Sequence, residues 1–103
     1  KLGYHPMYTE ITTTELRSRL DAGEPVILLD VRQPEEHEEK NIPNSILIPL
    51  GELPDRIDEL EPMRGKEIVV YCRSGNRSAQ ACLFLAANGY DDLKNLKGGM
   101  LAW

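Results

Sequence analysis

Residues 69–85, VVYCRSGNRSAQACLFL, decide the fold that we expect for this chain. An apolar run ends at Cys72, a short polar stretch with one glycine follows, and a pattern of small and apolar residues typical of a helix comes next. The pattern predicts a strand over residues 67–72 and a helix over residues 77–89, which Gly89 ends. Cys72 is therefore expected where a strand ends and a loop leads directly into a helix.

The rest of the chain repeats this alternation. Three further apolar runs are short, bounded and continuous, as in strands buried on both faces: 25–31, 45–50 and 92–96. Helices are expected between them and at the end: 12–23 (with Thr12 and Glu15 as a capping box), 34–39, 53–60 and a last one starting within 98–103. Strands that alternate with helices define an α/β protein, here an open parallel sheet of about four to five strands with helices on both faces.

Length and composition restrict the class of protein. A chain of 103 residues supports one domain, which we place at 9–103 after an irregular lead-in at 1–8. The net charge of −5 disfavours nucleic acid and anionic membranes as partners, and no apolar run reaches the roughly 18 residues of a membrane span. We expect a cytoplasmic protein, although a chain that begins at Lys1 also fits the periplasm.

The cysteines are expected to have different roles. Cys72 and Cys82 are too few for a disulfide framework or a zinc cluster, so we expect no metal. The helical pattern places Cys82 with Ala79, Leu83 and Ala86 on one apolar face, which predicts a core residue. Cys72 is flanked by arginines and a glycine that simple packing does not explain.

The residues around Cys72 favour a reactive thiolate. Arg73 and Arg77 bring two positive charges, and the N-terminus of the following helix adds its dipole. Gly75 permits a backbone conformation in which N–H groups curl around the sulfur. The loop Arg73, Ser74, Gly75, Asn76, Arg77, Ser78 is thus expected to bind an anion over Cys72. The Ser74 and Ser78 hydroxyls could donate to that anion, or Ser78 could instead be satisfied by the first turn of the helix.

Two reactions fit a cysteine in an anion-binding loop. In phosphoryl transfer, the thiolate attacks phosphorus and the loop holds three oxygens; in sulfur transfer, it attacks a sulfane sulfur and becomes a persulfide. Cysteine phosphatases have five residues between the cysteine and the arginine, whereas four separate Cys72 from Arg77. The shorter loop favours sulfur transfer.

At this point the sequence resembles a single-domain rhodanese, a thiosulfate sulfurtransferase-like protein. The resemblance extends over about residues 9–103 and rests on five segments in the family's order: DVRQPEEHE (30–38), NIPNSILIPL (41–50), VVYCRSGNRS (69–78), LAANGY (85–90) and NLKGGMLAW (95–103). It implies that Cys72 takes sulfane sulfur from a donor such as thiosulfate and passes it to a thiophilic acceptor such as cyanide or a thiol. The loop amides would hold the persulfide, and no cofactor is required.

The sequence also departs from the family. Members often carry GHIPGA where this chain has KNIPNS (40–45), so that Asn41 replaces the histidine and Asn44 the second glycine. The chain stops at Trp103, where members usually continue into a last helix, so we expect a C-terminal truncation or a larger parent protein.

Some roles stay open on the sequence alone. Asp30 and Arg32 follow a strand at the same sheet edge as Cys72 and either order the cysteine loop or form a structural ion pair or helix cap. His37 and the acids beside it are expected on a solvated helix face. Two alternatives to a sulfurtransferase also stay open: a persulfide carrier or docking module that serves a partner protein, and a cysteine phosphatase or arsenate reductase.

Overall fold

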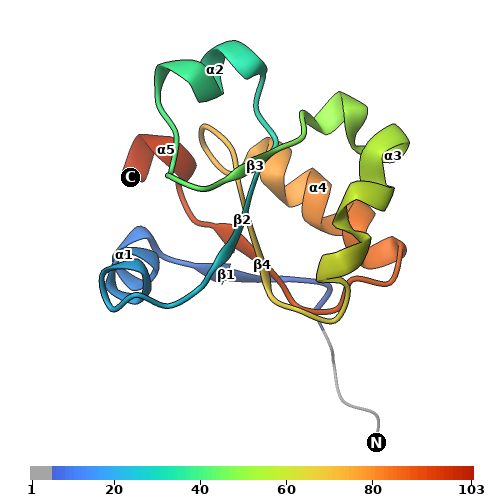
Figure 1. The fold of residues 1–103 in the computed structure, drawn as a ribbon, viewed down its shortest axis with the longest axis horizontal. Helices are drawn as coiled ribbons and strands as arrows, with labels where there is room; N and C mark the ends of the chain where they lie inside the picture. Colours follow the sequence, from blue (N-terminus) through green and yellow to red (C-terminus); the bar gives the residue numbers. More distant parts are fainter. Residues whose placement is uncertain (1–5) are drawn as a thin grey trace, which may run out of the picture.

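A five-stranded, fully parallel sheet forms the centre of the computed structural model, which describes residues 6–103 (Figure 1). The strand order is β1-β5-β4-β2-β3. The strands span Thr9–Ile11 (β1), Ile27–Asp30 (β2), Ile46–Leu47 (β3), Ile68–Tyr71 (β4) and Leu93–Leu96 (β5). β4 is central, and in register Val70 lies between Leu29 of β2 and Asn95 of β5.

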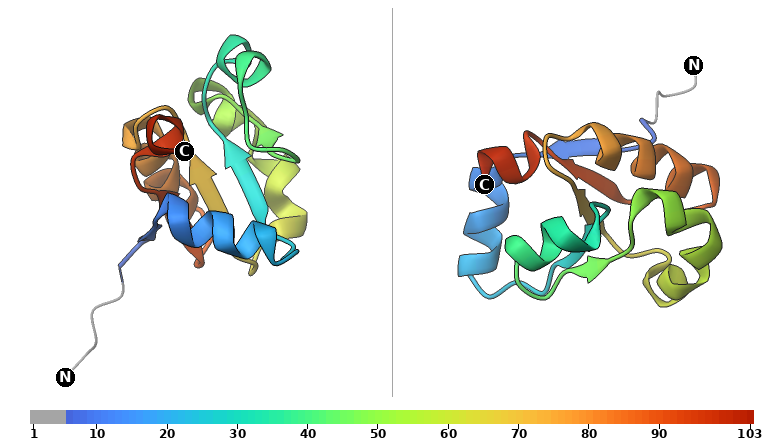
Figure 2. Two further views of the ribbon diagram at one scale, coloured as in Figure 1. Left: turned by 90° about the vertical axis from the view of Figure 1, so that its left-hand side faces the viewer. Right: turned by 90° about the horizontal axis from the view of Figure 1, so that it is seen from above.

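Helices cover both faces of the sheet, as the views in Figure 2 show. The α-helices are α1 (Thr13–Asp21), α2 (Pro34–Glu39), α3 (Leu53–Arg56), α4 (Asn76–Ala87) and α5 (Gly99–Ala102), and the 3-10 helices are η1 (Leu50–Glu52) and η2 (Ile57–Met63). One core cluster joins the sheet to α3, η2 and α4, and the other joins it to α1 and α5. The predicted fold class, an α/β open parallel sheet with helices on both faces, is confirmed.

Alternation along β4 decides which core Cys72 joins. Val69 and Tyr71 point to the α1 and α5 side, whereas Ile68, Val70 and Cys72 belong to the cluster on the α4 side. The thiol therefore lies beneath the start of the helix that follows it in the chain.

Most predicted elements are present, with local corrections. β1 was not predicted, because its three residues pair only with β5 and carry one buried side chain. The strand expected over 45–50 is only Ile46–Leu47, since the chain turns at Pro49 into η1. The helix expected over 53–60 starts as α3 and continues as η2. Of the expected lead-in, residues 1–5 lie outside the described residues.

The apolar face of α4 also differs from the expected one. The buried residues are Ser78, Ala81, Cys82 and Leu85, and Leu83 is 47% exposed. The buried face is thus shifted by about one residue along the chain from the expected face, so that Ser78 packs against the sheet.

The capping box predicted at the start of α1 is confirmed. The Glu15 amide donates to Thr12 Oγ1 at 3.1 Å, and the Thr12 amide donates to Glu15 Oε1 at 2.8 Å.

Among the helices of residues 6–103, none has the length and apolar character that crossing a membrane requires.

Candidate active site

The loop between β4 and α4 wraps around the sulfur of Cys72. Gly75, the N-cap of α4, has φ of 111°, a conformation that favours glycine, as the sequence predicted. It lets the Gly75 amide donate to Cys72 Sγ at 3.1 Å, and the Ser78 amide donates at 3.4 Å. Cys72 is 1% exposed, and the exposed residues Arg73, Ser74 and Asn76 lie around it in the loop.

These hydrogen bonds make the thiol more acidic than an ordinary cysteine. Burial raises the pKa of Cys72, but hydrogen bonds that the Ser78 side chain and the Ser78, Gly75 and Ser74 amides offer to the ionised sulfur outweigh it, so that the pKa is lowered overall. The sequence assigned much of this effect to Arg73 and Arg77. Neither arginine is among the principal causes in the structure, because the donors that contact the sulfur belong to backbone amides and a serine.

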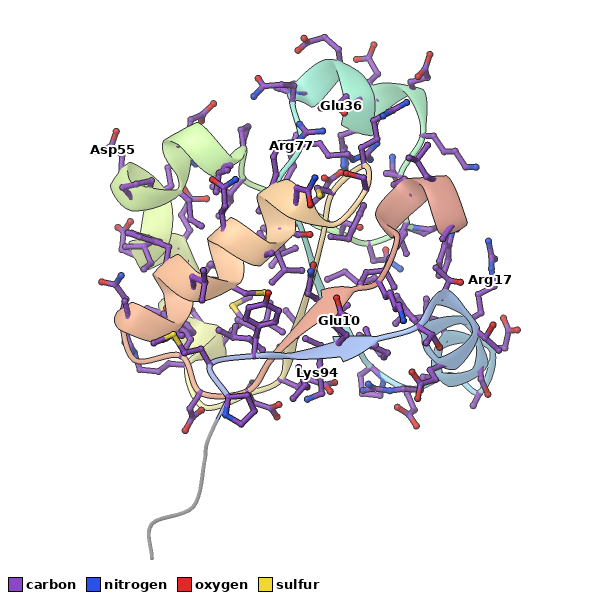
Figure 3. All side chains as sticks on the ribbon, turned by 180° about the vertical axis from the view of Figure 1, so that it is seen from behind. Glu10, Arg17, Glu36, Asp55, Arg77 and Lys94 are labelled. Atoms are coloured by element: carbon purple, nitrogen blue, oxygen red, sulfur yellow. The ribbon has the colours of Figure 1, made fainter. Side chains whose placement is uncertain are left out.

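Arg77 is held by an acidic residue of α2. Its Nη1 and Nη2 donate to Glu36 Oε1 and Oε2 at 2.7 and 2.9 Å, and these bonds lower the pKa of Glu36 to about 2 (Figure 3). Glu36 was expected on a solvated face, an interpretation that the ion pair corrects. Arg73, in contrast, is exposed and forms no ion pair within residues 6–103.

Asp30 and Arg32 form a buried ion pair at the same sheet edge. Arg32 Nε and Nη2 donate to the Asp30 carboxylate at 3.0 and 2.8 Å, and Arg32 Nη2 also donates to the Lys40 carbonyl at 2.6 Å. Asp30 and Arg32 thus form the structural ion pair that was one of the expected roles. They do not cap α2, because the N-cap of that helix is Gln33. His37 is not simply solvated, since its Nδ1 lies 2.9 Å from Asp30 Oδ2 and its side chain is 24% exposed.

Two residues that support the loop were not predicted from the sequence. Asn95 of β5 is 3% exposed; its Nδ2 donates to the Gly75 carbonyl at 3.1 Å, and its Oδ1 lies 2.5 Å from Ser78 Oγ. Gly99 lies directly against the loop, where a Cβ would come within 2.4 Å of the Cys72 carbonyl oxygen. A polar residue inside an apolar strand was the available signal for Asn95, and the GG pair was the signal for Gly99.

The departures at Asn41 and Asn44 are accommodated. Asn44 has φ of 68°, a left-handed conformation that asparagine tolerates better than most residues, so it fills the place of a glycine. Asn41 Nδ2 donates to the His37 carbonyl at 2.8 Å and ties α2 to this loop.

Cys82 is a core residue, as predicted. It is fully buried and unpaired with Cys72, and burial raises the pKa of its thiol to about 12. In the part of the chain that the structure describes, no group of His, Cys, Asp or Glu side chains is arranged to hold a metal ion.

An α/β sheet with a cysteine in an amide-lined loop at its carboxyl edge defines a class of thiol-dependent transferases and phosphatases. The chain belongs to the family of rhodanese-like domains, whose model matches residues 12–103.

Named relatives agree with this assignment. A protein named sulfurtransferase from Allochromatium vinosum is 40% identical over 97 residues, which cover 94% of this chain and 89% of the relative. A crystal structure of a rhodanese-like domain protein from Staphylococcus aureus has a TM-score of 0.84 at 39% identity, covering 92% of this chain and 90% of that one. A putative sulfur carrier protein from Bacillus subtilis is 36% identical and covers 91% of this chain, which spans 50% of that protein.

Proposed function

We propose that the protein is a sulfurtransferase that carries sulfane sulfur on Cys72. The observation that carries the proposal is the hydrogen bonding of Cys72 Sγ, which accepts from the Gly75 and Ser78 amides at 3.1 and 3.4 Å. Fixed amide donors stabilise a sulfur anion without having to reorganise. The similarity to proteins named sulfurtransferases supports the same reaction class.

The proposed reaction has two displacements. The Cys72 thiolate attacks the sulfane sulfur of a donor such as thiosulfate; an Sγ–S bond forms, the S–S bond of the donor breaks, and sulfite leaves with the electron pair. A thiophilic acceptor such as cyanide or a thiol then attacks the outer sulfur, and the Sγ–S electron pair returns to Cys72. No oxidant or cofactor is required.

The loop residues have separate roles in this scheme. The Ser74, Gly75 and Ser78 amides stabilise the sulfur, and Arg73 is the exposed cation that first meets an anionic donor. Asp30 and Arg32 act from outside the loop by fixing the sheet edge on which it rests. Phosphoryl transfer is less well supported, because Asp30 is buried and bonded to Arg32 and so is poorly placed as a general acid.

A persulfide carrier that serves a partner protein is the second candidate, favoured by the similarity to a putative sulfur carrier protein. The same loaded Cys72 would serve both roles. They differ in what loads and unloads it, since a carrier exchanges sulfur with a protein rather than with small molecules.

Intact-protein mass after brief incubation with thiosulfate tests the proposal. We expect the wild type and Cys82→Ala to gain one sulfur atom, Cys72→Ala to gain none, and cyanide to reverse the gain. A wild type that stays unloaded while Cys72 is reduced and alkylatable would contradict thiosulfate chemistry. Loading by a protein persulfide in its place would then identify the carrier.

A further inference from the structure

Ser78 and Asn95 share a hydrogen bond whose direction is determined. Ser78 Oγ and Asn95 Oδ1 lie 2.5 Å apart, and both side chains are buried. An amide oxygen carries no hydrogen, so the hydroxyl of Ser78 must donate. The orientation of the amide is set from its other end, because Asn95 Nδ2 donates to the Gly75 carbonyl at 3.1 Å.

The sulfur of Cys72 faces the same hydroxyl. Cys72 Sγ lies 3.3 Å from Ser78 Oγ. A hydroxyl has a single hydrogen, so while it points to Asn95 it offers the sulfur only lone pairs. That arrangement suits a neutral thiol, which donates its own hydrogen to Ser78, but it leaves a thiolate without this donor.

We propose that Asn95 is a positioning residue that competes with the Cys72 sulfur for the hydroxyl hydrogen of Ser78. In the thiol state the hydrogen lies on the Asn95 side. When Cys72 ionises, the hydroxyl rotates toward the sulfur, and the bond to Asn95 breaks. The thiol of Cys72 is therefore a weaker acid than it would be without Asn95. The hydrogen bond between Ser78 and Asn95 is lost when the sulfur ionises and forms again when the sulfur becomes neutral.

The inference rests on the proposed function only for its consequence. In the persulfide the charge lies on the outer sulfur, and the inner sulfur is neutral, so the hydroxyl returns to Asn95. Asn95 thus stabilises the loaded state relative to the free thiolate. The competition itself is a property of three side chains and can be measured without any sulfur donor.

The charged and titratable groups near the sulfur are the same in every variant required for a test. Arg77 and Cys82 on α4 interact electrostatically with Cys72, and Arg77 is held by Glu36 of α2. Arg73 lies next to Cys72 in the loop, and the Asp30 carboxylate of β2 is paired with Arg32.

The test is a double-mutant cycle on the pKa of Cys72. The rate of alkylation by iodoacetamide is followed against pH, with the Cys72 peptide identified by mass, in the wild type, Asn95→Leu, Ser78→Ala and the double variant. Leucine resembles asparagine in shape but has no acceptor. Asn95→Ala serves in the same cycle should the leucine variant fail to fold.

We expect Asn95→Leu to lower the pKa of Cys72 by about one unit, the effect of one hydrogen bond, because the hydroxyl is freed for the thiolate. Ser78→Ala should raise it, and Asn95→Leu should shift it little in the Ser78→Ala background. An equal shift of Asn95→Leu in both backgrounds would mean that Asn95 acts only by anchoring Gly75, and it would overturn the proposal. So would a raised pKa in Asn95→Leu with Ser78 present.

Discussion

Glu36 of α2 binds both terminal nitrogens of Arg77 of α4, although the two residues are 41 positions apart in the chain. Both side chains are about one-third exposed, at 29% and 33%. The carboxylate binds the N–H edge of the guanidinium with both oxygens, and this edge would otherwise be free to bind an anion. The positive charge of Arg77 is therefore compensated beside the loop that holds Cys72, and Arg73 remains the exposed cation there.

Freeing Arg77 should favour anionic reagents at Cys72. Glu36→Gln keeps an acceptor for the Gln33 amide but removes the charge that compensates Arg77. We expect the ratio of alkylation rates with iodoacetate and iodoacetamide, one anionic and one neutral, to rise about threefold and to fall again at high salt. Glu35→Gln on the same helix is the matched control and should leave the ratio unchanged. Equal ratios in both variants would mean that Arg77 does not act on the approach of anions.

The Glu36–Arg77 pair should also make stability depend on pH. Hydrogen bonds from Arg77 lower the pKa of Glu36 from 4.5 to about 2, so the pair contributes fully above pH 4.5 and its contribution is lost as pH falls toward 2. At neutral pH, Glu36→Gln should reduce the free energy of unfolding by about 1 kcal/mol. The difference from wild type should shrink between these pH values in urea titrations, and a constant difference down to pH 2 would contradict the assignment.

Gly99 should tolerate no side chain. It has φ of 55°, and a Cβ would come within 2.4 Å of the Cys72 carbonyl and 2.6 Å of the Arg73 carbonyl. We expect Gly99→Ala to lower the free energy of unfolding by about 3 kcal/mol or more and to slow alkylation of Cys72. Gly23→Ala, with φ of 79° but no atom within 4 Å, measures the cost of the conformation alone, about 1 kcal/mol. Equal losses in both variants would show that the clash is relieved.

The two cysteines should react differently. Both side chains are buried, but burial raises the pKa of Cys82 to about 12, whereas hydrogen bonds to the sulfur lower the pKa of Cys72. At pH 8 iodoacetamide should alkylate one cysteine of the native protein, Cys72. In denaturant it should alkylate both cysteines. Peptide mass after alkylation identifies the residue. Rapid modification of Cys82 in the native state would indicate that α4 opens readily.

Removing the charge of Asp30 should test its structural role. Asp30→Asn leaves the guanidinium of Arg32, which is 4% exposed, without a counter-ion, and we expect a loss of about 3 kcal/mol in the free energy of unfolding. Asp92→Asn breaks the exposed contact with Lys94 and should cost well under 1 kcal/mol. An alkylation rate of Cys72 that falls while Asp30→Asn stays fully stable would instead assign Asp30 a direct effect on the loop.

What the sequence determined by itself follows from short-range regularities. The continuous apolar runs, the capping box at Thr12 and the stop at Gly89 depend on residues a few positions apart, so the order of strands and helices was readable. The spacing from Cys72 to Arg77 is also local, and with Gly75 it was enough to predict a loop around a thiol.

Only the tertiary structure decided which side chains meet at that loop. Glu36, Asn95 and Gly99 come from three other segments. A polar residue inside a strand and a GG pair make Asn95 and Gly99 unusual in the sequence, but these local signals do not say that the loop of Cys72 is what they contact. Their contacts arise because parallel strands bring distant residues to one sheet edge. In addition, the face of α4 that packs on the sheet carries Ser78 rather than Ala79, so that Ser78 meets Asn95. Local patterns carry no information about such meetings, since the contacts are created by packing.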